Sequence, residues 1–163
     1  MMPKIDKILY ATDLSQSAAL ALRYAMLLGE KFDAKVTLLH VVETVSHEAR
    51  LAFYEACIDG DTQKQMSKTK KTEATAAMEQ RLESYCREEL PDDAEACFSK
   101  VKIDICQGYP EEQILSKADK YDVDVIVMGT HEKGFAHTFL GSVAKRVLRR
   151  SRKPVFIVPL PEL

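Results

Sequence analysis

The residues best suited to chemistry lie near the end of the chain, where glycines bracket a polar loop. Val125–Met128 is an apolar run typical of a buried strand, and Gly129 follows it directly. After the loop, Gly141 and Ser142 open a helical segment. Glycines let the backbone approach a ligand closely, and the free N–H groups at the start of a helix attract anions. This order of strand, glycine, loop, glycine and helix predicts a phosphate site, and therefore a nucleotide-binding protein.

Two more segments are expected to lie beside this loop. Ala11–Asp13 follows the first expected strand, Val41–Glu43 follows the second, and Gly129–His131 follows the fourth. In open parallel sheets, ligands bind outside the carboxyl ends of the strands, at the point where the strand order reverses. The three segments therefore predict the walls of one ligand site.

Strands and helices alternate along the chain. Apolar patterns predict strands at 5–11, 35–42, 101–105, 124–128 and 155–158, and helical spacing predicts helices at 17–32, 61–90, 111–121 and 141–150. The alternation predicts an α/β fold, a single open parallel sheet with helices on both faces, and one domain over residues 1–163. The alternating strand at 101–105 is expected at a sheet edge.

Local details of the helices also follow from the sequence. Asp13 and Ser15 are placed to cap the first helix. The long helix carries an apolar stripe, and its members are Ala74, Met78, Leu82 and Tyr85. Residues 43–60 are expected to form a looser insert, with a short helix around Leu51, Tyr54 and Ile58.

Composition and motif searches argue against several classes of protein. The net charge of −2 and the pI of about 6.1 give no reason to expect nucleic acid or an anionic membrane as partner. No apolar run is long enough to cross a bilayer, and the first residues lack a signal-peptide core, so a cytoplasmic location is expected. Neither a Walker A pattern nor a dinucleotide fingerprint is present. The irregularly spaced cysteines, which are Cys57, Cys86, Cys97 and Cys106, are expected to be reduced and mostly structural.

Several ordered motifs resemble the universal stress protein family. They are KILYATDLSQSAALALRYAMLLG, KVTLLHVVE, QGYPEEQILSKADKYDVDVIVMGTH and LGSVAKRVLRRSRKPVFIVP, and only residues 44–100 stand outside the likeness. The resemblance implies a Rossmann-like fold of the adenine nucleotide alpha hydrolase type, with five parallel strands in the order 3-2-1-4-5. It also implies a homodimer that pairs through the last strand, Val155 to Val158.

The same resemblance implies a ligand, which is ATP, possibly with Mg²⁺. Members that bind ATP carry a Gly-x2-Gly-x9-Gly-(Ser/Thr) signature. Here Gly129 and Gly141-Ser142 match, but Glu132 replaces the second glycine, and the loop is one residue short. A non-glycine residue at positive φ costs about 1–2 kcal/mol, and a carboxylate beside a phosphate repels it. Gly134 lies nearby and is a candidate to restore the turn.

Matching positions give a set of candidate ligand residues. By the resemblance, Asp13 contacts the adenosine part, Ala11 and Val41 line the adenine pocket, and the residues around Gly141 contact phosphate. The full candidate set is Ala11, Thr12, Asp13, Val41, Met128, Gly129, His131, Gly141, Ser142 and Val143. Each has an ordinary alternative, such as a helix cap for Asp13, a core position for Val41 and a solvated side chain for His131.

Three functional hypotheses follow. The first is a cytoplasmic homodimer in which an adenine nucleotide acts as a regulatory signal in the stress response. The second is a family member without nucleotide binding that serves as a protein-interaction module, because Glu132 breaks the signature. The third is a slow ATPase, for which only Glu132 or His131 offers a base in the loop. We expect the protein not to be an enzyme.

Overall fold

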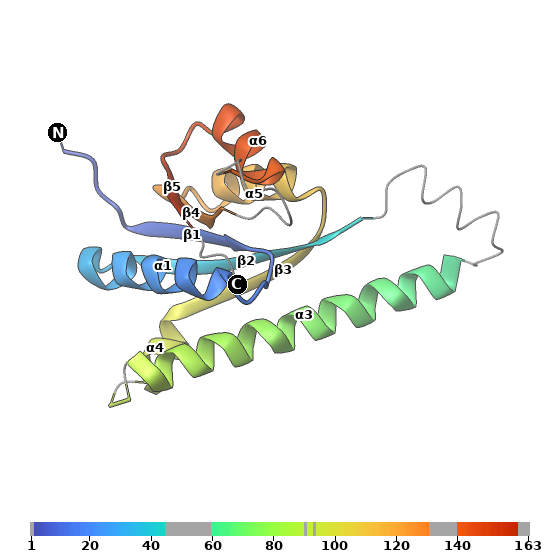
Figure 1. Cartoon of the computed structure of the whole chain (residues 1–163), viewed down its shortest axis with the longest axis horizontal. Coiled ribbons are helices and arrows are strands. Elements are labelled where there is room, and N and C mark those ends of the chain that lie inside the picture. Colours follow the sequence, from blue (N-terminus) through green and yellow to red (C-terminus); the bar gives the residue numbers. More distant parts are fainter. Residues whose placement is uncertain (1, 45–59, 90, 93, 131–139, 160–163) are drawn as a thin grey trace.

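The computed structural model describes residues 2–44, 60–89, 91–92, 94–130 and 140–159. Its centre is a five-stranded sheet in the order β3-β2-β1-β4-β5 (Figure 1). The strands are β1 (Lys7–Thr12), β2 (Lys35–Glu43), β3 (Val101–Gly108), β4 (Val125–Gly129) and β5 (Val155–Val158). All neighbouring pairs are parallel, so the expected fold class and strand order are confirmed.

Burial along the strands follows their place in the sheet. Residues 8–11 of β1 and residues 125–128 of β4 are buried at every position, because helices cover both faces of these inner strands. β3 is mostly half-exposed along its length, which agrees with the edge position predicted from its alternating sequence. The other edge strand, β5, is short and largely apolar, so its sequence lacks the alternation of polar and apolar residues seen in β3.

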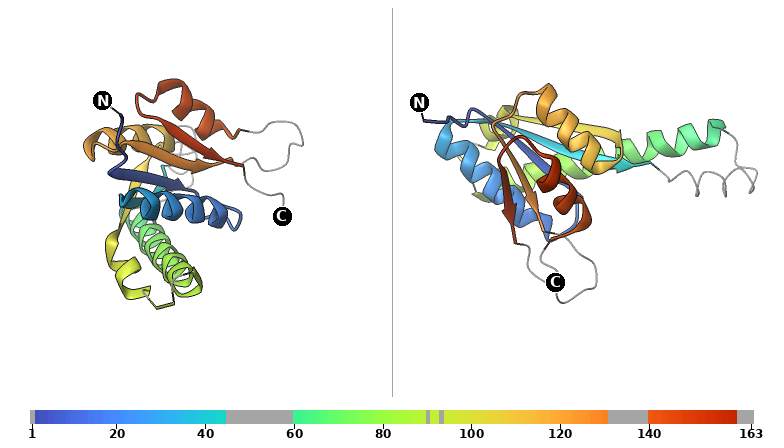
Figure 2. Two further views of the ribbon diagram at one scale, coloured as in Figure 1. Left: turned by 90° about the vertical axis from the view of Figure 1, so that its left-hand side faces the viewer. Right: turned by 90° about the horizontal axis from the view of Figure 1, so that it is seen from above.

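Helices cover both faces of the sheet (Figure 2). On one face, α1 (Ala18–Phe32), α3 (Gly60–Glu89) and α4 (Ala94–Lys100) pack over side chains such as Ile8, Tyr10 and Leu38. On the other face, α5 (Pro110–Lys120) and α6 (Ser142–Arg150) pack over Leu9, Leu39 and Ile126. Two separate apolar clusters therefore hold the layers together.

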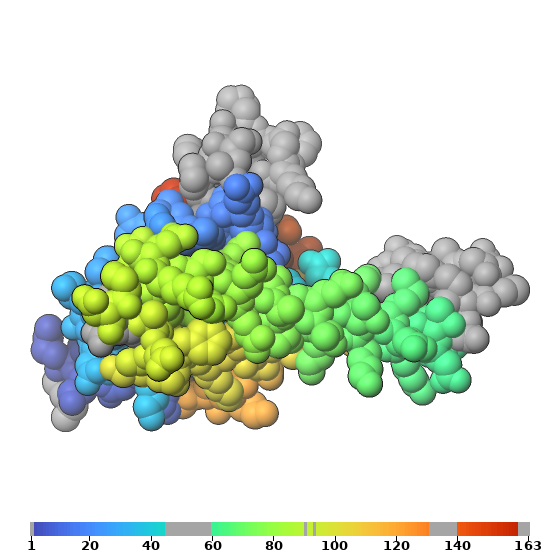
Figure 3. All heavy atoms as spheres, turned by 90° about the horizontal axis from the view of Figure 1, so that it is seen from below, coloured from blue at the N-terminus to red at the C-terminus, as the bar shows by residue number. Residues whose placement is uncertain are grey.

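The helix α3 is the longest element and has two different halves. Its buried residues, Ala74, Met78, Leu82 and Cys86, all lie in the carboxyl-terminal part. The amino-terminal part extends past the body of the molecule, as the green segment in Figure 3 shows. The predicted stripe is confirmed except at its end, where Cys86 is buried and Tyr85 is only partly so.

The cysteine prediction was wrong for one pair. Cys86 of α3 and Cys97 of α4 form a disulfide, with their Cα atoms 6.0 Å apart. No helix was predicted at α4, and this helix packs against α3 and brings Cys97 to Cys86. Cys106 is a free, half-buried thiol whose pKa is raised by burial, and Cys57 lies outside the described residues.

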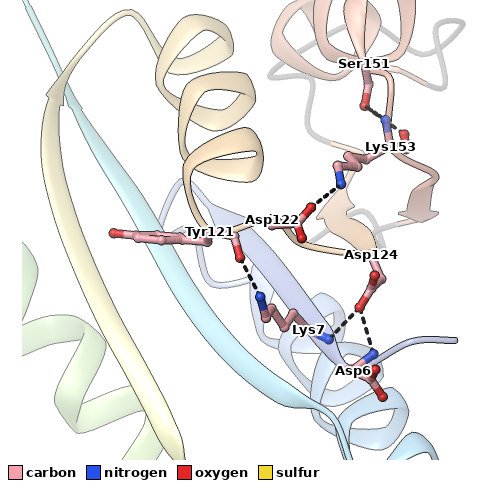
Figure 4. A network of polar contacts seen from close by, with 7 residues as sticks. All are labelled: Asp6, Lys7, Tyr121, Asp122, Asp124, Ser151 and Lys153. Carbon is pink, nitrogen blue, oxygen red and sulfur yellow. Dashed lines mark hydrogen bonds and ion pairs between the residues drawn. The ribbon is translucent and has the colours of Figure 1, made fainter.

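A polar network fixes the amino-terminal edge of the sheet (Figure 4). One Asp124 carboxylate oxygen accepts the backbone N–H groups of Asp6 and Lys7, at 2.8 and 2.9 Å. The Lys153 ammonium donates to Asp122 at 2.9 Å. These bonds join the starts of β1, β4 and β5, so the opposite edge is left for the carboxyl ends of the strands.

Two further predictions concern the insert after β2 and membrane-spanning segments. Residues 45–59, including the predicted short helix around Leu51, Tyr54 and Ile58, lie outside the described part of the chain. Among the described residues, no helix has both the length and the apolar character needed to span a bilayer.

The close approach of α1 to β2 gives a stability prediction. A Cβ at Gly29 would stand 2.6 Å from Cγ2 of Val36, a β-branched side chain fixed in the sheet. Although alanine is the better helix former by about 1 kcal/mol, overpacking of this kind costs about 1–3 kcal/mol. We therefore expect Gly29→Ala to lower the free energy of unfolding, measured by urea denaturation. Gly60→Ala is the control, because no atom lies within 4 Å of the added Cβ. Equal stability of Gly29→Ala and the wild type would contradict the packing.

Candidate functional site

A cavity of about 740 Å³ opens at the carboxyl-terminal edge of the sheet. Its walls contain nine of the ten candidate residues predicted from the sequence, namely Ala11, Thr12, Asp13, Val41, Met128, Gly129, Gly141, Ser142 and Val143. His131 lies outside the described residues, as do Glu132 and Gly134. The segments expected to meet therefore do meet.

Strand pairing explains why these positions come together. Ala11 of β1 lies opposite Met128 of β4 and, on its other side, opposite Leu39 of β2. From β1 the chain continues outward to β2 and β3 on one side, and later to β4 and β5 on the other. The strand order reverses between β1 and β4, and the helices that follow them, α1 and α6, cover opposite faces of the sheet. The cavity lies at this switch point.

The start of α6 forms one wall of the cavity. Gly141 is the residue before the helix, with an extended backbone at ψ 163°, and among the described residues no side chain caps the helix. The first turn contains no acidic residue, and the helix is 9 residues long. Unpaired N–H groups and the positive end of the helix dipole make such a terminus attractive to an anion.

The loop between β1 and α1 forms a second wall. The Thr12 hydroxyl accepts the Leu14 N–H at 3.1 Å, and Oδ1 of Asp13 accepts the Ser15 N–H at 2.9 Å. Leu14 has a φ of 63°, a conformation that costs a residue with a side chain about 1–2 kcal/mol. Such a loop persists only where its surroundings hold it in place.

The predicted capping role of Asp13 and Ser15 was wrong. The residue that precedes α1 is Ser17, and no side chain forms a cap hydrogen bond there. Asp13 instead stabilises the turn before the helix, and its exposed side chain lies at the cavity wall.

Two residues that the sequence analysis did not place in the site hold this loop. Nδ1 of His40 donates to the Thr12 carbonyl at 2.9 Å, since a carbonyl oxygen can only accept. Nη2 of Arg81, on α3, donates to the Leu14 carbonyl at 2.9 Å, while its Nη1 is buried without a hydrogen-bond partner. No sequence motif marks either residue, because both act across long separations in the chain.

Helices from both faces complete the cavity. Lys70, Glu73, Ala74 and Ala77 contribute from α3, and Pro110 and Ile114 contribute from α5. Sequence reasoning missed the α3 residues because the family resemblance does not extend to that region. The one available signal was helical spacing, since Lys70 and Ala77 flank the buried Ala74 within one turn on either side.

Tyr10 of β1 is buried, and its hydroxyl has a structural role. Burial raises the pKa of Tyr10 to about 12, and its hydroxyl donates to the Ala18 carbonyl at 2.7 Å. Tyr10 therefore remains protonated and anchors β1 to α1. Among the residues that the structure describes, no group of three or more metal-binding side chains is assembled.

A half-buried ion pair holds α5 against β3. The Lys117 ammonium donates to Oδ2 of Asp104 at 2.6 Å, and the Tyr121 hydroxyl donates to the same oxygen at 2.5 Å. Burial raises the pKa of Asp104, but these two hydrogen bonds lower it more, so the pKa lies below its ordinary value. The pair fixes the position of α5, whose first turns line the cavity.

The fold and the site define an α/β protein with a ligand cavity at a topological switch point and an uncapped helix start facing it. The model of the universal stress protein family matches residues 4–159, so the chain belongs to this family.

Individual relatives extend the comparison. Universal stress protein MJ0577 of Methanocaldococcus jannaschii is 32% identical over 156 residues, which cover 93% of each chain. The solved structure of protein MJ0577 covers 99% of this chain and 100% of that chain, with a TM-score of 0.73 and 29% identity. A universal stress protein solved in complex with cAMP has a TM-score of 0.62 at 20% identity, covering 98% of this chain and 100% of that chain. One from Archaeoglobus fulgidus, solved with dAMP, has a TM-score of 0.52 at 17% identity, covering 98% of this chain and 100% of that chain.

The Asp104 pair predicts a pH-dependent stability. Because the folded pKa of Asp104 is lowered, the pair stabilises the fold above the unfolded pKa of about 3.9 and stops doing so as the pH falls through the folded pKa. Asp104→Asn should cost about 1–3 kcal/mol of unfolding free energy at pH 7. The difference in unfolding free energy between the variant and the wild type, measured by urea denaturation, should shrink towards pH 3. Asp119→Asn, at an exposed position on α5, is the matched control. A difference that is constant from pH 3 to pH 7 would contradict the pair.

Proposed function

We propose that this universal stress protein binds an adenine nucleotide in the cavity at the carboxyl edge of the sheet, and that the nucleotide acts as a regulatory ligand. The observation that carries the proposal is the uncapped start of α6 at Gly141-Ser142, which shares one cavity with Asp13 and Val41. An anion-binding helix start, a carboxylate and an apolar slot suit the phosphate, sugar and base of a nucleotide in turn.

The strand order suggests how the nucleotide lies. Phosphates would bind the first turn of α6, beside Gly129 at the end of β4. The base would pack on Val41 of β2, on the opposite side of β1. Asp13 leaves β1 between these two positions, where its carboxylate can accept hydrogen bonds from ribose hydroxyls. The structures solved with cAMP and dAMP support an adenine nucleotide as the class of ligand.

The alternative is the interaction module without nucleotide. Glu132 and the shortened loop motivate it, because both weaken the glycine signature. ATP with Mg²⁺ remains our proposal for the particular ligand, with AMP as the simplest ligand that uses the same walls. A non-enzymatic role and a cytoplasmic location both stay predictions from the sequence.

We also propose that the protein is a homodimer that pairs through β5. β5 is an edge strand, and its Phe156 is 38% exposed. The ring of Phe156 lies 6.0 Å from the ring of Tyr24, which is also exposed, so the edge continues into an apolar patch on α1. Exposed apolar edge strands favour pairing with another chain.

Calorimetric titration of the nucleotide-free protein with ATP and AMP, each with and without Mg²⁺, tests the proposed ligand. We expect micromolar binding by the wild type and a loss of about tenfold in affinity for Asp13→Ala, which removes a charged hydrogen-bond acceptor. Asp92→Asn, at an exposed site in the turn before α4, is the control. No heat of binding up to millimolar nucleotide would reject the proposal and favour the interaction module, and Glu132→Gly would then show whether the broken signature is the cause.

A further inference from the structure

The cavity extends to the face of the sheet that α3 covers. Leu39 and Val41 of β2 belong to the apolar cluster under α5 and α6, whereas Val42 belongs to the cluster under α1 and α3. Residues of both faces line the same cavity, together with His40 and the α3 residues. The cavity therefore wraps around the end of β2, and α3 forms its outer wall there.

This α3 wall lies at the end of the cavity away from the proposed phosphate site. α6 follows β4, on one side of β1, whereas α3 packs on β2 and β3, on the other side. A nucleotide with its phosphates on α6 must direct its base towards β2. The α3 residues of the wall line the same cavity as the end of β2, and the course of α3 past the end of the sheet is visible in Figure 1.

Two charged side chains stand at this wall. Lys70 and Glu73 are three residues apart on one helix, a spacing that places them on the same face. Neither side chain forms a hydrogen bond or an ion pair with another described residue. Ala74 and Ala77, which also line the cavity, have small side chains that leave space beside the two charged groups. The wall thus offers an ammonium donor beside a carboxylate acceptor.

We propose that Lys70 and Glu73 determine base specificity, by selecting a 6-aminopurine over a 6-oxopurine. Adenine presents an amino donor at position 6 and an acceptor at N1. Glu73 accepts from the amino group, and Lys70 donates to N1. Hypoxanthine has the opposite pattern, because position 6 is an acceptor oxygen and N1 carries a hydrogen. The oxygen would then face the Glu73 carboxylate, and the N–H would face the Lys70 ammonium. This inference rests on the proposed nucleotide function and adds to it the residues that identify the base.

The test compares ATP with ITP, which differ only at position 6 and N1 of the base. Calorimetric titration of the wild type should give ATP an affinity at least about tenfold greater than that of ITP. Glu73→Gln and Lys70→Met should each reduce this ratio, and the double variant should bring it close to one. Lys71→Met and Glu79→Gln, which are exposed on α3 and do not line the cavity, are the matched controls and should retain the wild-type ratio.

The ratio of the ATP affinity to the ITP affinity distinguishes recognition of the base from a general effect of charge. If Lys70 merely attracted phosphate, its loss would weaken ATP and ITP equally and leave the ratio unchanged, which would overturn the inference. An unchanged ratio with intact ATP binding would overturn base reading while the proposed function stands. If the wild type bound neither ATP nor ITP, both the base-specificity inference and the proposed nucleotide function would be overturned. Both positions are exposed and Glu73→Gln keeps its shape, so folding is expected to be unaffected and is checked by circular dichroism.

Discussion

The parallel pairing of β1 with both β2 and β4 is the constraint on which the site depends. The register that sets Ala11 between Leu39 and Met128 aligns the ends of three strands at one edge. The described residues at these strand ends, among them Thr12, Val41 and Gly129, therefore line one cavity. The polar network around Asp124 holds the opposite edge, where the strands begin.

Long-range hydrogen bonds complete what the strand pairing begins. The loop after β1 contains Leu14 in a left-handed conformation, and its carbonyl groups are held by His40 from β2 and by Arg81 from α3. A site loop under strain is thereby tied to the longest helix of the molecule. The loop that contains Asp13 is consequently hydrogen-bonded to α3, so the ligand proposed at Asp13 would contact a segment that is directly joined to this helix.

The sequence predicted the parts of this arrangement that local patterns control. Strand and helix positions follow from apolar spacing, and the cavity residues at Ala11–Asp13, Val41 and Gly141 follow from their place after strands or before a helix. It did not predict α4, the Cys86–Cys97 disulfide or the roles of His40 and Arg81. Each of these depends on two segments that meet only after folding, and one residue in isolation carries no mark of its distant partner.

The central claim is that one adenine nucleotide spans the cavity from α6 to α3. A crystal structure of the protein grown with saturating ATP tests this most directly. The account predicts phosphate oxygens within hydrogen-bond distance of the N–H groups at Gly141–Val143, and a base packed on Val41 with its amino group towards Glu73. Nucleotide density on another surface, or an empty cavity at a concentration far above the measured Kd, would contradict it.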